Sequence, residues 1–102
     1  DNHVRQTTLR GLTVTEMAMA TVDGNTVDDG VGIGILCSDY SMCDIRENSI
    51  SGIRRDHESS DSMREGYGIV SHYFAHTEVE GNDVSRTRHT MGAFADAYIT
   101  SR

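Results

Sequence analysis

All four asparagines of this 102-residue chain stand in one local sequence frame, and their spacing constrains the fold more than any other feature. The four copies are "DNHV" around Asn2, "VDGNTV" around Asn25, "IRENSI" around Asn48 and "VEGNDV" around Asn82. The first three asparagines are spaced twenty-three positions apart, and the fourth follows the third by thirty-four, which is one such period plus eleven. A repeat of constant length that carries one insertion therefore accounts for all four copies.

A second block, which begins with glycine, follows each asparagine frame. Its copies are "GLTVTE" from Gly11, "GILCSD" from Gly34, "GIVSHY" from Gly68 and "GAFADA" from Gly92. The first two copies begin nine positions after an asparagine, the third begins twenty positions after one, and the fourth begins ten positions after one. Because the third copy is displaced by the same eleven positions, both blocks predict an insertion between Ser51 and Gly66.

Both blocks have the two-residue alternation of β-strands, with β-branched residues in the apolar positions and glycines at the expected bends. A unit of three short strands cannot bury its own apolar face, and stacking successive units solves that problem. The repeat therefore predicts a parallel β-solenoid whose equivalent residues form columns with a spacing of about 4.8 Å. The expected interior columns are Val4, Val27, Ile50 and Val84; Val22, Ile45 and Val79; Leu12, Ile35, Ile69 and Ala93; and Ala20, Cys43 and Thr77.

The asparagines are predicted to form a ladder along this solenoid. A side-chain amide at a tight bend can bond the local backbone and also its copy in the next unit. We therefore expect Asn2, Asn25, Asn48 and Asn82 to be structural residues. The alternative is four solvated asparagines in unrelated turns.

The charge balance limits the partners of the chain. The formal net charge is -7, and all nine basic residues are arginines. Nucleic acids and anionic membrane surfaces attract clustered positive charge, so we expect neither as a partner. The sequence has no run of 18 or more apolar residues, and its first residues lack the basic and apolar regions of a signal peptide.

The two cysteines, Cys37 and Cys43, are six residues apart. This spacing matches neither a zinc site nor a C-x-x-C redox motif, and two cysteines are too few for a disulfide scaffold. We expect both to be free and buried as small hydrophobic residues, with a disulfide between them as the alternative.

These units resemble the coils of right-handed parallel β-helix proteins, the pectate-lyase-like superfamily. The stretch "GIGILCSDYSMCDIRENSISGI" is similar to the "G-I-x-L … I-x-x-N-x-I" repeat of its periplasmic copper-binding-type and carbohydrate-modifying members. The resemblance implies an all-β, right-handed parallel β-helix of about four 23-residue coils, with the 11-residue insertion in the third. Residues 1–102 are expected to form one domain and, because the sequence opens in mid-coil, a segment of a longer β-helix.

The insertion is the first candidate site. The stretch "GIRRDHESSDSMREG", Gly52 to Gly66, is dense in charged residues, and in β-helix enzymes such loops wall the substrate groove. We expect Arg54 and Arg55 to bind the carboxylate of an acidic sugar, and Asp56 and His57 to move protons. The alternative is a loop that is polar only because it faces water.

An outward column of the glycine-led block is the second candidate site. It is predicted to contain Thr15, Ser38, His72 and Asp96. A serine, a histidine and an aspartate are the residue types of a nucleophile, a base and an orienting acid. The alternative to a catalytic site is a set of unrelated polar surface residues, because no oxyanion donor is identifiable.

The adjacent outward column is predicted to be an exposed apolar stripe of Thr13, Leu36, Val70 and Phe94. Such a stripe marks a ligand or partner surface, and with Tyr73, Phe74 and His76 it predicts a groove along the helix axis. The alternative is a stripe covered by a loop or by further parts of the chain. We expect no metal site, because the four-residue spacing of His72 and His76 suits a helix and not a bending strand.

These features predict an extracellular, cell-surface or virion-type β-helix segment that binds an acidic polysaccharide. If the chain is an enzyme, it is expected to be a polysaccharide lyase, epimerase or glycoside hydrolase. The expected catalytic residues are His57, His72, Tyr73 and Asp56, and the expected substrate-binding residues are Arg54, Arg55, Leu36, Val70 and Phe94. No cofactor is expected, with calcium as the alternative. The rival hypothesis is a non-enzymatic assembly or adhesion module that binds further copies of itself, or the remaining coils of a longer chain, through the apolar stripe and open coil ends.

Overall fold

The computed structural model of the chain describes residues 3–5, 10–54 and 66–101. In these ranges the regular structure consists of short β-strands. The strands are β1 (His3–Arg5), β2 (Arg10–Val14), β3 (Met19–Asp23), β4 (Thr26–Asp28), β5 (Ile33–Ser38), β6 (Met42–Arg46), β7 (Ser49–Ser51), β8 (Tyr67–His72), β9 (His76–Glu80), β10 (Asp83–Ser85), β11 (His89–Phe94) and β12 (Tyr98–Ser101). The described residues contain no helix with the length and hydrophobicity that crossing a membrane requires.

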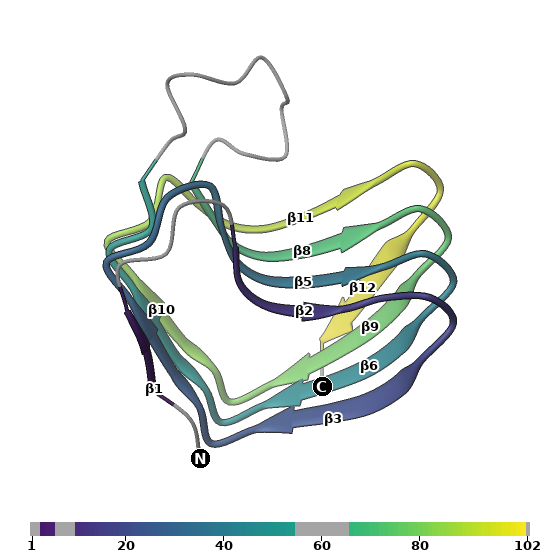
Figure 1. The fold of residues 1–102 in the computed structure, drawn as a ribbon, viewed down its shortest axis with the longest axis horizontal. Coiled ribbons are helices and arrows are strands. Elements are labelled where there is room, and N and C mark those ends of the chain that lie inside the picture. Colours follow the sequence, from purple (N-terminus) through teal and green to yellow (C-terminus); the bar gives the residue numbers. More distant parts are fainter. Residues whose placement is uncertain (1–2, 6–9, 55–65, 102) are drawn as a thin grey trace.

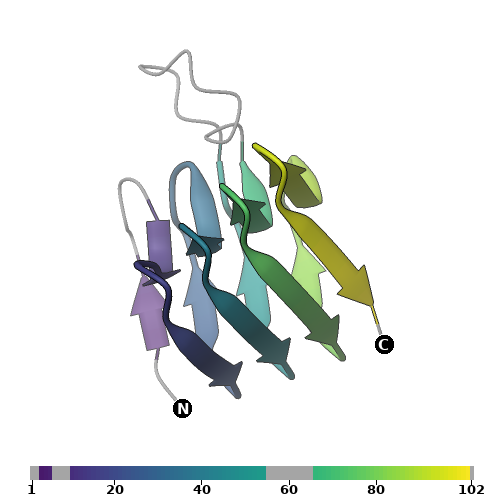
Figure 2. The same cartoon turned by 90° about the vertical axis from the view of Figure 1, so that its right-hand side faces the viewer.

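The strands form three four-stranded sheets, which the chain visits in a fixed order (Figure 1). Sheet A contains β1, β4, β7 and β10; sheet B contains β2, β5, β8 and β11; and sheet C contains β3, β6, β9 and β12. Every strand pair is parallel, and equivalent strands of successive coils lie side by side (Figure 2). The predicted all-β, parallel β-helix is confirmed.

The register of the sheets reproduces the sequence period. In sheet A, Val27 pairs with Ile50, one period further along the chain, whereas in sheet B, Ile33 pairs with Tyr67, which is one period plus eleven positions away. The additional residues therefore lie between the end of β7 and the start of β8, as predicted, and residues 55–65 of this segment lie outside the described ranges. The strand pairing predicted for the interior columns of sheets A and C is also confirmed.

The fourth coil differs from the prediction in sheet B. Ile69 pairs with Met91, not with Ala93, because the chain from β8 to β11 is one residue shorter than the sequence period. The prediction took Gly92 as the start of the glycine-led block. That glycine has a different role, since a Cβ atom there would lie 2.7 Å from the ring of Tyr67.

The true glycine column packs against sheet A. A Cβ atom on Gly34 would lie 2.5 Å from the carbonyl oxygen of Gly68 and 2.9 Å from Cγ2 of Ile50. A Cβ atom on Gly11 would meet Cγ1 of Val27 at 2.6 Å in the same way. These positions therefore need glycine because the two sheets approach closely there.

The asparagine amides connect the coils at the bend between sheets C and A. Oδ1 of Asn48, which is buried, accepts hydrogen bonds from the backbone N and Nδ2 of Asn25, at 2.9 and 3.1 Å. Nδ2 of Asn48 donates to the carbonyl oxygen of Val22 and to Oδ1 of Asn82, both at 2.9 Å. Oδ1 of Asn82 also accepts from the backbone N of Asn48 at 2.9 Å. The first rung predicted for this ladder, Asn2, lies outside the described residues.

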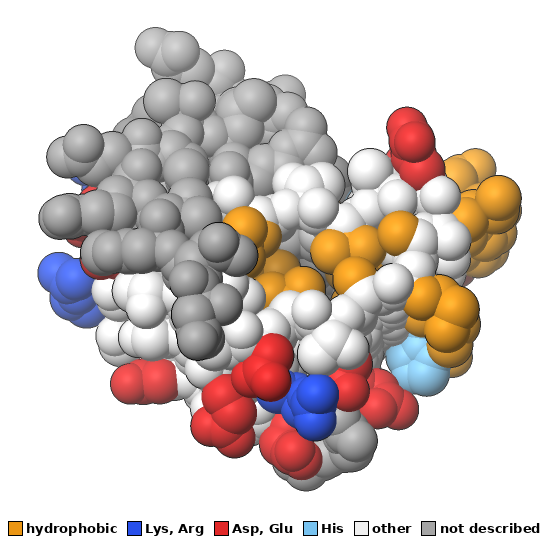
Figure 3. Space-filling view, turned by 60° about the horizontal axis from the view of Figure 1, so that its bottom comes forward, with side chains coloured by type: hydrophobic (Ala, Val, Ile, Leu, Met, Phe, Trp, Pro, Cys, Tyr) orange, Lys and Arg blue, Asp and Glu red, His pale blue; other side chains and the backbone are white. Residues whose placement is uncertain are grey.

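The outward positions of sheet C carry most of the visible charge (Figure 3). Arg46 pairs in register with Asp23 on one side and Glu80 on the other. Its Nε atom lies 3.5 Å from Oδ2 of Asp44. Exposed ion pairs of this kind contribute little stability. Four carboxylates, those of Asp23, Asp44, Glu78 and Glu80, accompany this one arginine, so the outer face of sheet C is mainly negative here.

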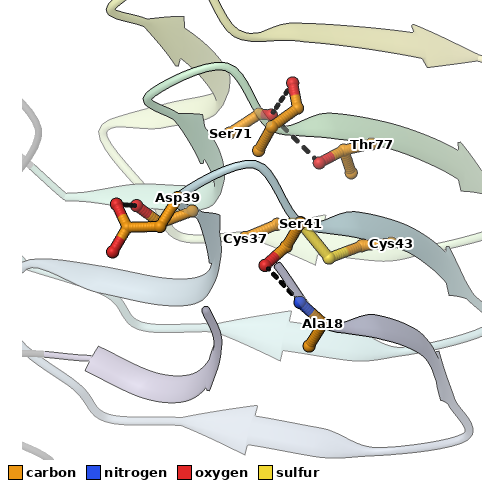
Figure 4. The surroundings of a disulfide bond; sticks show 9 residues. Ala18, Cys37, Asp39, Ser41, Cys43, Ser71 and Thr77 are labelled. Carbon is orange, nitrogen blue, oxygen red and sulfur yellow. Dashed lines mark hydrogen bonds between the residues drawn. A yellow bond between two sulfur atoms is a disulfide. The ribbon is translucent and has the colours of Figure 1, made fainter. Parts of the chain in front are cut away.

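Cys37 and Cys43 form a disulfide, and the expectation of free thiols was wrong (Figure 4). The two Cα atoms are 6.4 Å apart, within the usual range for a disulfide, because the turn between β5 and β6 brings the interior faces of sheets B and C together. In the next coil the equivalent positions hold Ser71 and Thr77. There Oγ1 of Thr77 donates to Oγ of Ser71 at 3.0 Å, so a hydrogen bond connects the same two positions.

We predict that Asn48→Ala lowers the free energy of unfolding by about 3 kcal/mol, because it leaves buried amide groups in two neighbouring coils without partners. Urea denaturation followed by circular dichroism measures this loss. Ser49→Ala, at the adjacent exposed position, is the control and should change stability by less than about 0.5 kcal/mol. A loss below about 1 kcal/mol for Asn48→Ala would contradict a structural role for the ladder.

Candidate functional site

The turn that leads from sheet B to sheet C has the same unusual backbone in every described coil. Two consecutive residues adopt positive φ angles, between 52° and 63°. The pairs are Glu16 and Met17, Asp39 and Tyr40, Tyr73 and Phe74, and Ala95 and Asp96. Backbone hydrogen bonds connect the turns, for example from the N of Tyr40 to the carbonyl oxygen of Tyr73 at 3.0 Å. For residues other than glycine this left-handed conformation costs about 1 kcal/mol or more each.

Three aromatic side chains project from the two middle turns, and we call Tyr40, Tyr73 and Phe74 the aromatic ledge. The rings of Tyr40 and Phe74 are nearly parallel, with centroids 5.1 Å apart. The ring of Tyr73 is roughly perpendicular to both, at 5.5 and 5.2 Å. The exposed fractions of these residues are 52%, 44% and 44%. The ledge is therefore a solvent-facing aromatic surface and not part of the core.

A hydrogen-bonded polar cluster lies beside the ledge. Oγ of Ser38 donates to Oδ1 of Asp39 at 2.9 Å, and Oγ1 of Thr15 donates to Oδ2 of Asp39 at 2.9 Å. Nδ1 of His72 lies 3.1 Å from Oγ of Ser38. Since the single hydroxyl proton of Ser38 is directed to Asp39, its Oγ accepts from His72, which places the imidazole proton on Nδ1.

This arrangement differs from the nucleophile, base and acid predicted for the column. Ser38 and His72 do pair in register, but the next residue of that column is Phe94, and Asp96 belongs to the turn beyond it. Ser38 is also buried, and its proton is already donated to a carboxylate. The column predicted to contain Thr15, Ser38, His72 and Asp96 is therefore wrong at its last member, and the serine, histidine and aspartate do not form a triad.

The hydroxyl of Thr15, followed by that of Ser38, holds the pKa of the Asp39 carboxyl below its ordinary value. A smaller contribution in the same direction comes from the charge of His72. Partial desolvation opposes these effects. The carboxylate is thus stabilised in its charged form at neutral pH.

The outward column of sheet B is apolar, but it is not the exposed stripe that was predicted. Leu36 and Val70 are only 4% and 0% exposed, and they form a cluster separate from the interior core. Tyr67 and Phe94 pack against this cluster. Phe94 belongs to the adjacent column, and Gly92 is the residue that pairs with Val70. A ligand therefore has little direct access to Leu36 or Val70.

Of the residues predicted in the insertion, Arg54 is the one that the structure describes. Arg54 is exposed and forms an isolated parallel bridge with Val31. Arg55, Asp56 and His57 lie outside the described residues. His72 and Tyr73, by contrast, are adjacent at the end of β8, next to the polar cluster and the ledge.

A second candidate site lies on the outer face of sheet C. Met19, Met42, His76 and Tyr98 occupy one outward row on the four successive strands. Met19 is 80% exposed and Met42 is 50% exposed, whereas the ring of His76 stacks on Tyr98 with centroids 4.3 Å apart. A shallow groove of about 310 Å³ runs between this row and the parallel row of Thr21, Asp44 and Glu78.

The family model described as "Periplasmic copper-binding protein (NosD)" matches residues 1–100. The chain belongs to the NosD family. Comparison with curated proteins and with solved structures gave no significant match. The family description is periplasmic, which agrees with a disulfide in the interior, since the periplasm is an oxidising compartment.

The sheet C row of this NosD chain offers two thioether sulfurs and one imidazole, from Met19, Met42 and His76. Thioether sulfurs and imidazole nitrogens are ligands for copper, and thioethers favour Cu(I). The cysteines do not offer thiolates, because they are joined to each other. Within the described ranges, no three or more His, Cys, Asp or Glu side chains lie close enough to hold a metal ion. Copper binding at this row would therefore depend on its methionine sulfurs.

The sequence prediction missed this row, although a signal was present. Met19, Met42 and His76 each stand six residues before a ladder asparagine. Met17, Tyr40 and Phe74 likewise each stand eight residues before one. Comparing outward positions against the asparagine frame, and not against the glycine-led block, identifies both rows.

We predict that Asp39→Asn destabilises the fold at neutral pH and that this effect disappears in acid. Because the folded-state pKa of Asp39 is lowered, its contribution to stability is present above about pH 4, where unfolded aspartate is ionised, and is lost as the pH falls further. Urea denaturation between pH 2.5 and pH 7 measures the difference between wild type and variant. The exposed Asp96→Asn is the control, and a difference for Asp39→Asn that stays constant with pH would contradict the prediction.

Proposed function

We propose that this chain is a periplasmic β-helix module that binds copper, as Cu(I), in the groove on the outer face of sheet C. Met19, Met42 and His76 are the proposed ligands. The family description supports copper as the metal, and the register of β3, β6 and β9 supports these residues as its ligands.

The row of two thioethers and one imidazole is the observation that carries this proposal. Neighbouring strands of a parallel sheet are about 4.8 Å apart, so flexible methionine side chains on adjacent strands reach a common point beside the histidine. His76 is held against Tyr98, which limits the rotation of its ring. The groove thus offers one positioned nitrogen and two adaptable sulfurs.

The same row accounts for a preference for a soft metal ion. Calcium, the alternative considered from the sequence, needs six to eight oxygen ligands. Asp44 and Glu78 line the groove, but carboxylates favour hard cations and add little affinity for Cu(I). We therefore propose copper, and not calcium, as the metal of this surface.

We expect anaerobic titration against a chromogenic Cu(I) chelator to give one Cu(I) per chain. Met42→Leu and His76→Ala should each weaken Cu(I) binding at least tenfold, because each removes one of three ligands from the row. X-ray absorption spectroscopy should show sulfur and nitrogen neighbours around the copper.

Met91→Leu is the matched control, since Met91 is also exposed but lies outside the row. It should leave the affinity unchanged. Equal losses for Met42→Leu and Met91→Leu, or a preference for Ca²⁺ over Cu(I), would refute the proposed site.

We also propose a second function, recognition of a polysaccharide. The contact of His72 with Tyr73, a member of the exposed aromatic ledge, favours it. An acidic polysaccharide would additionally use Arg54, Arg55, Asp56 and His57 of the insertion, and lyase or epimerase chemistry would require His57 or His72 as a base. The rival assembly hypothesis has lost its main support, since Leu36 and Val70 are buried within a single chain.

A screen of uronate polysaccharides for binding, and for the ultraviolet absorbance of unsaturated products, tests this second function. If His72 acts as the base, His72→Ala should abolish product formation while the melting temperature stays within a few degrees of that of the wild type. Product formation that survives His72→Ala would exclude this role of His72, and binding without any product would make the chain a recognition module.

A further inference from the structure

We infer that the aromatic ledge of Tyr40, Tyr73 and Phe74 binds uncharged pyranose units of a polysaccharide. The inference rests on the second proposed function, and it specifies both the site and the kind of sugar. It departs from the sequence prediction, which placed an acidic sugar at the insertion.

The backbone of the ledge is the first observation. All three aromatic residues have positive φ angles, although bulky side chains are strongly disfavoured there. Core packing does not compensate this cost, because about half of each residue is exposed. The same turn backbone recurs at Glu16 and Met17 and at Ala95 and Asp96, so the fold imposes it. What distinguishes the ledge is that bulky aromatic side chains occupy these positions while about half of each residue stays exposed.

The charges near the ledge determine which sugars it accepts. The two turns that carry it and the equivalent turns of the flanking coils contain the acidic residues Glu16, Asp39 and Asp96 at their positive-φ positions, and no arginine or lysine there. The Asp39 carboxylate is further held in place by Thr15 and Ser38. A uronate would be repelled by this negative rim, whereas an uncharged sugar would not.

The chemistry of the surface matches a sugar ring. A pyranose has a face of C–H groups and a rim of hydroxyls, so it needs an apolar surface bordered by hydrogen-bonding groups. The rings of Tyr40, Tyr73 and Phe74 supply the apolar surface. The Asp39 carboxylate supplies hydroxyl acceptors, and the imidazole of His72 beside it supplies a further hydrogen-bonding group.

The size of the ledge argues against a protein partner. Three half-exposed aromatic side chains offer roughly 300 Å² of surface, given about 150–250 Å² for each complete side chain. A stable protein interface buries about 800 Å² on each partner. The three rings come from two successive coils, about 4.8 Å apart, which instead suits one or two sugar units of a single chain.

Isothermal titration of the intact chain with cellohexaose, N-acetylated chitohexaose and hexagalacturonate tests the inference. We expect at least one of the two uncharged hexasaccharides to bind at least tenfold more tightly than hexagalacturonate. Tyr40→Ala and Phe74→Leu should each weaken that binding at least tenfold, and circular dichroism should show that both variants remain folded. Tyr98→Ala is the matched control, because Tyr98 is as exposed as Tyr40 but lies on sheet C, and it should bind as the wild type does.

Three other results would overturn the inference. Tighter binding of hexagalacturonate would leave polysaccharide recognition standing but exclude the uncharged ligand. Binding of uncharged sugars that is unaffected by Tyr40→Ala and Phe74→Leu would exclude the ledge as the site. If no oligosaccharide binds, the inference and the second proposed function both fail, and self-association in sedimentation that these variants abolish would make the ledge a protein interface.

Discussion

The carboxamide of Asn48 bonds simultaneously to the coil before it and the coil after it, and the whole stack depends on this interaction. Parallel strands alone fix the spacing of the coils but leave their register open to slippage, because backbone groups are alike at every position. An amide that donates to one neighbouring coil and accepts from the other is satisfied in a single register. The same carboxamide also bonds a backbone carbonyl and a backbone N–H at the bend, those of Val22 and Asn25.

Once the register is fixed, each position of the repeat becomes a row of side chains along the molecule. Inward rows form the core of β-branched residues, with small cross-links where two sheets meet. Outward rows are free to vary, and here they hold methionine and histidine on sheet C and aromatic residues on the turn. A binding surface can thus be assembled from residues that are a full coil apart in the sequence, without any change in the fold.

The sequence period was sufficient to predict the fold and the register of sheets A and C, because the asparagine frame repeats without error there. The prediction failed at the fourth coil. There Thr90 occupies the position that glycine holds in the other coils, and the nearby Gly92 was taken for that glycine. The cysteines were misjudged because spacing along the chain does not reveal that a turn brings two interior positions together. The candidate sites were harder still, since a row of unlike side chains, such as Met19, Met42 and His76, has no motif of its own.

The pair of interior positions at the turn between sheets B and C shows how tolerant this architecture is. One coil joins them by a covalent bond between Cys37 and Cys43, and the next by the hydroxyls of Ser71 and Thr77. Both pairs fit the same backbone, so the local stability of a coil can be adjusted at two residues while its neighbours remain unchanged. The stability of one coil therefore depends on the redox state of its surroundings, whereas the cross-link in the next coil contains no bond that a reductant can break.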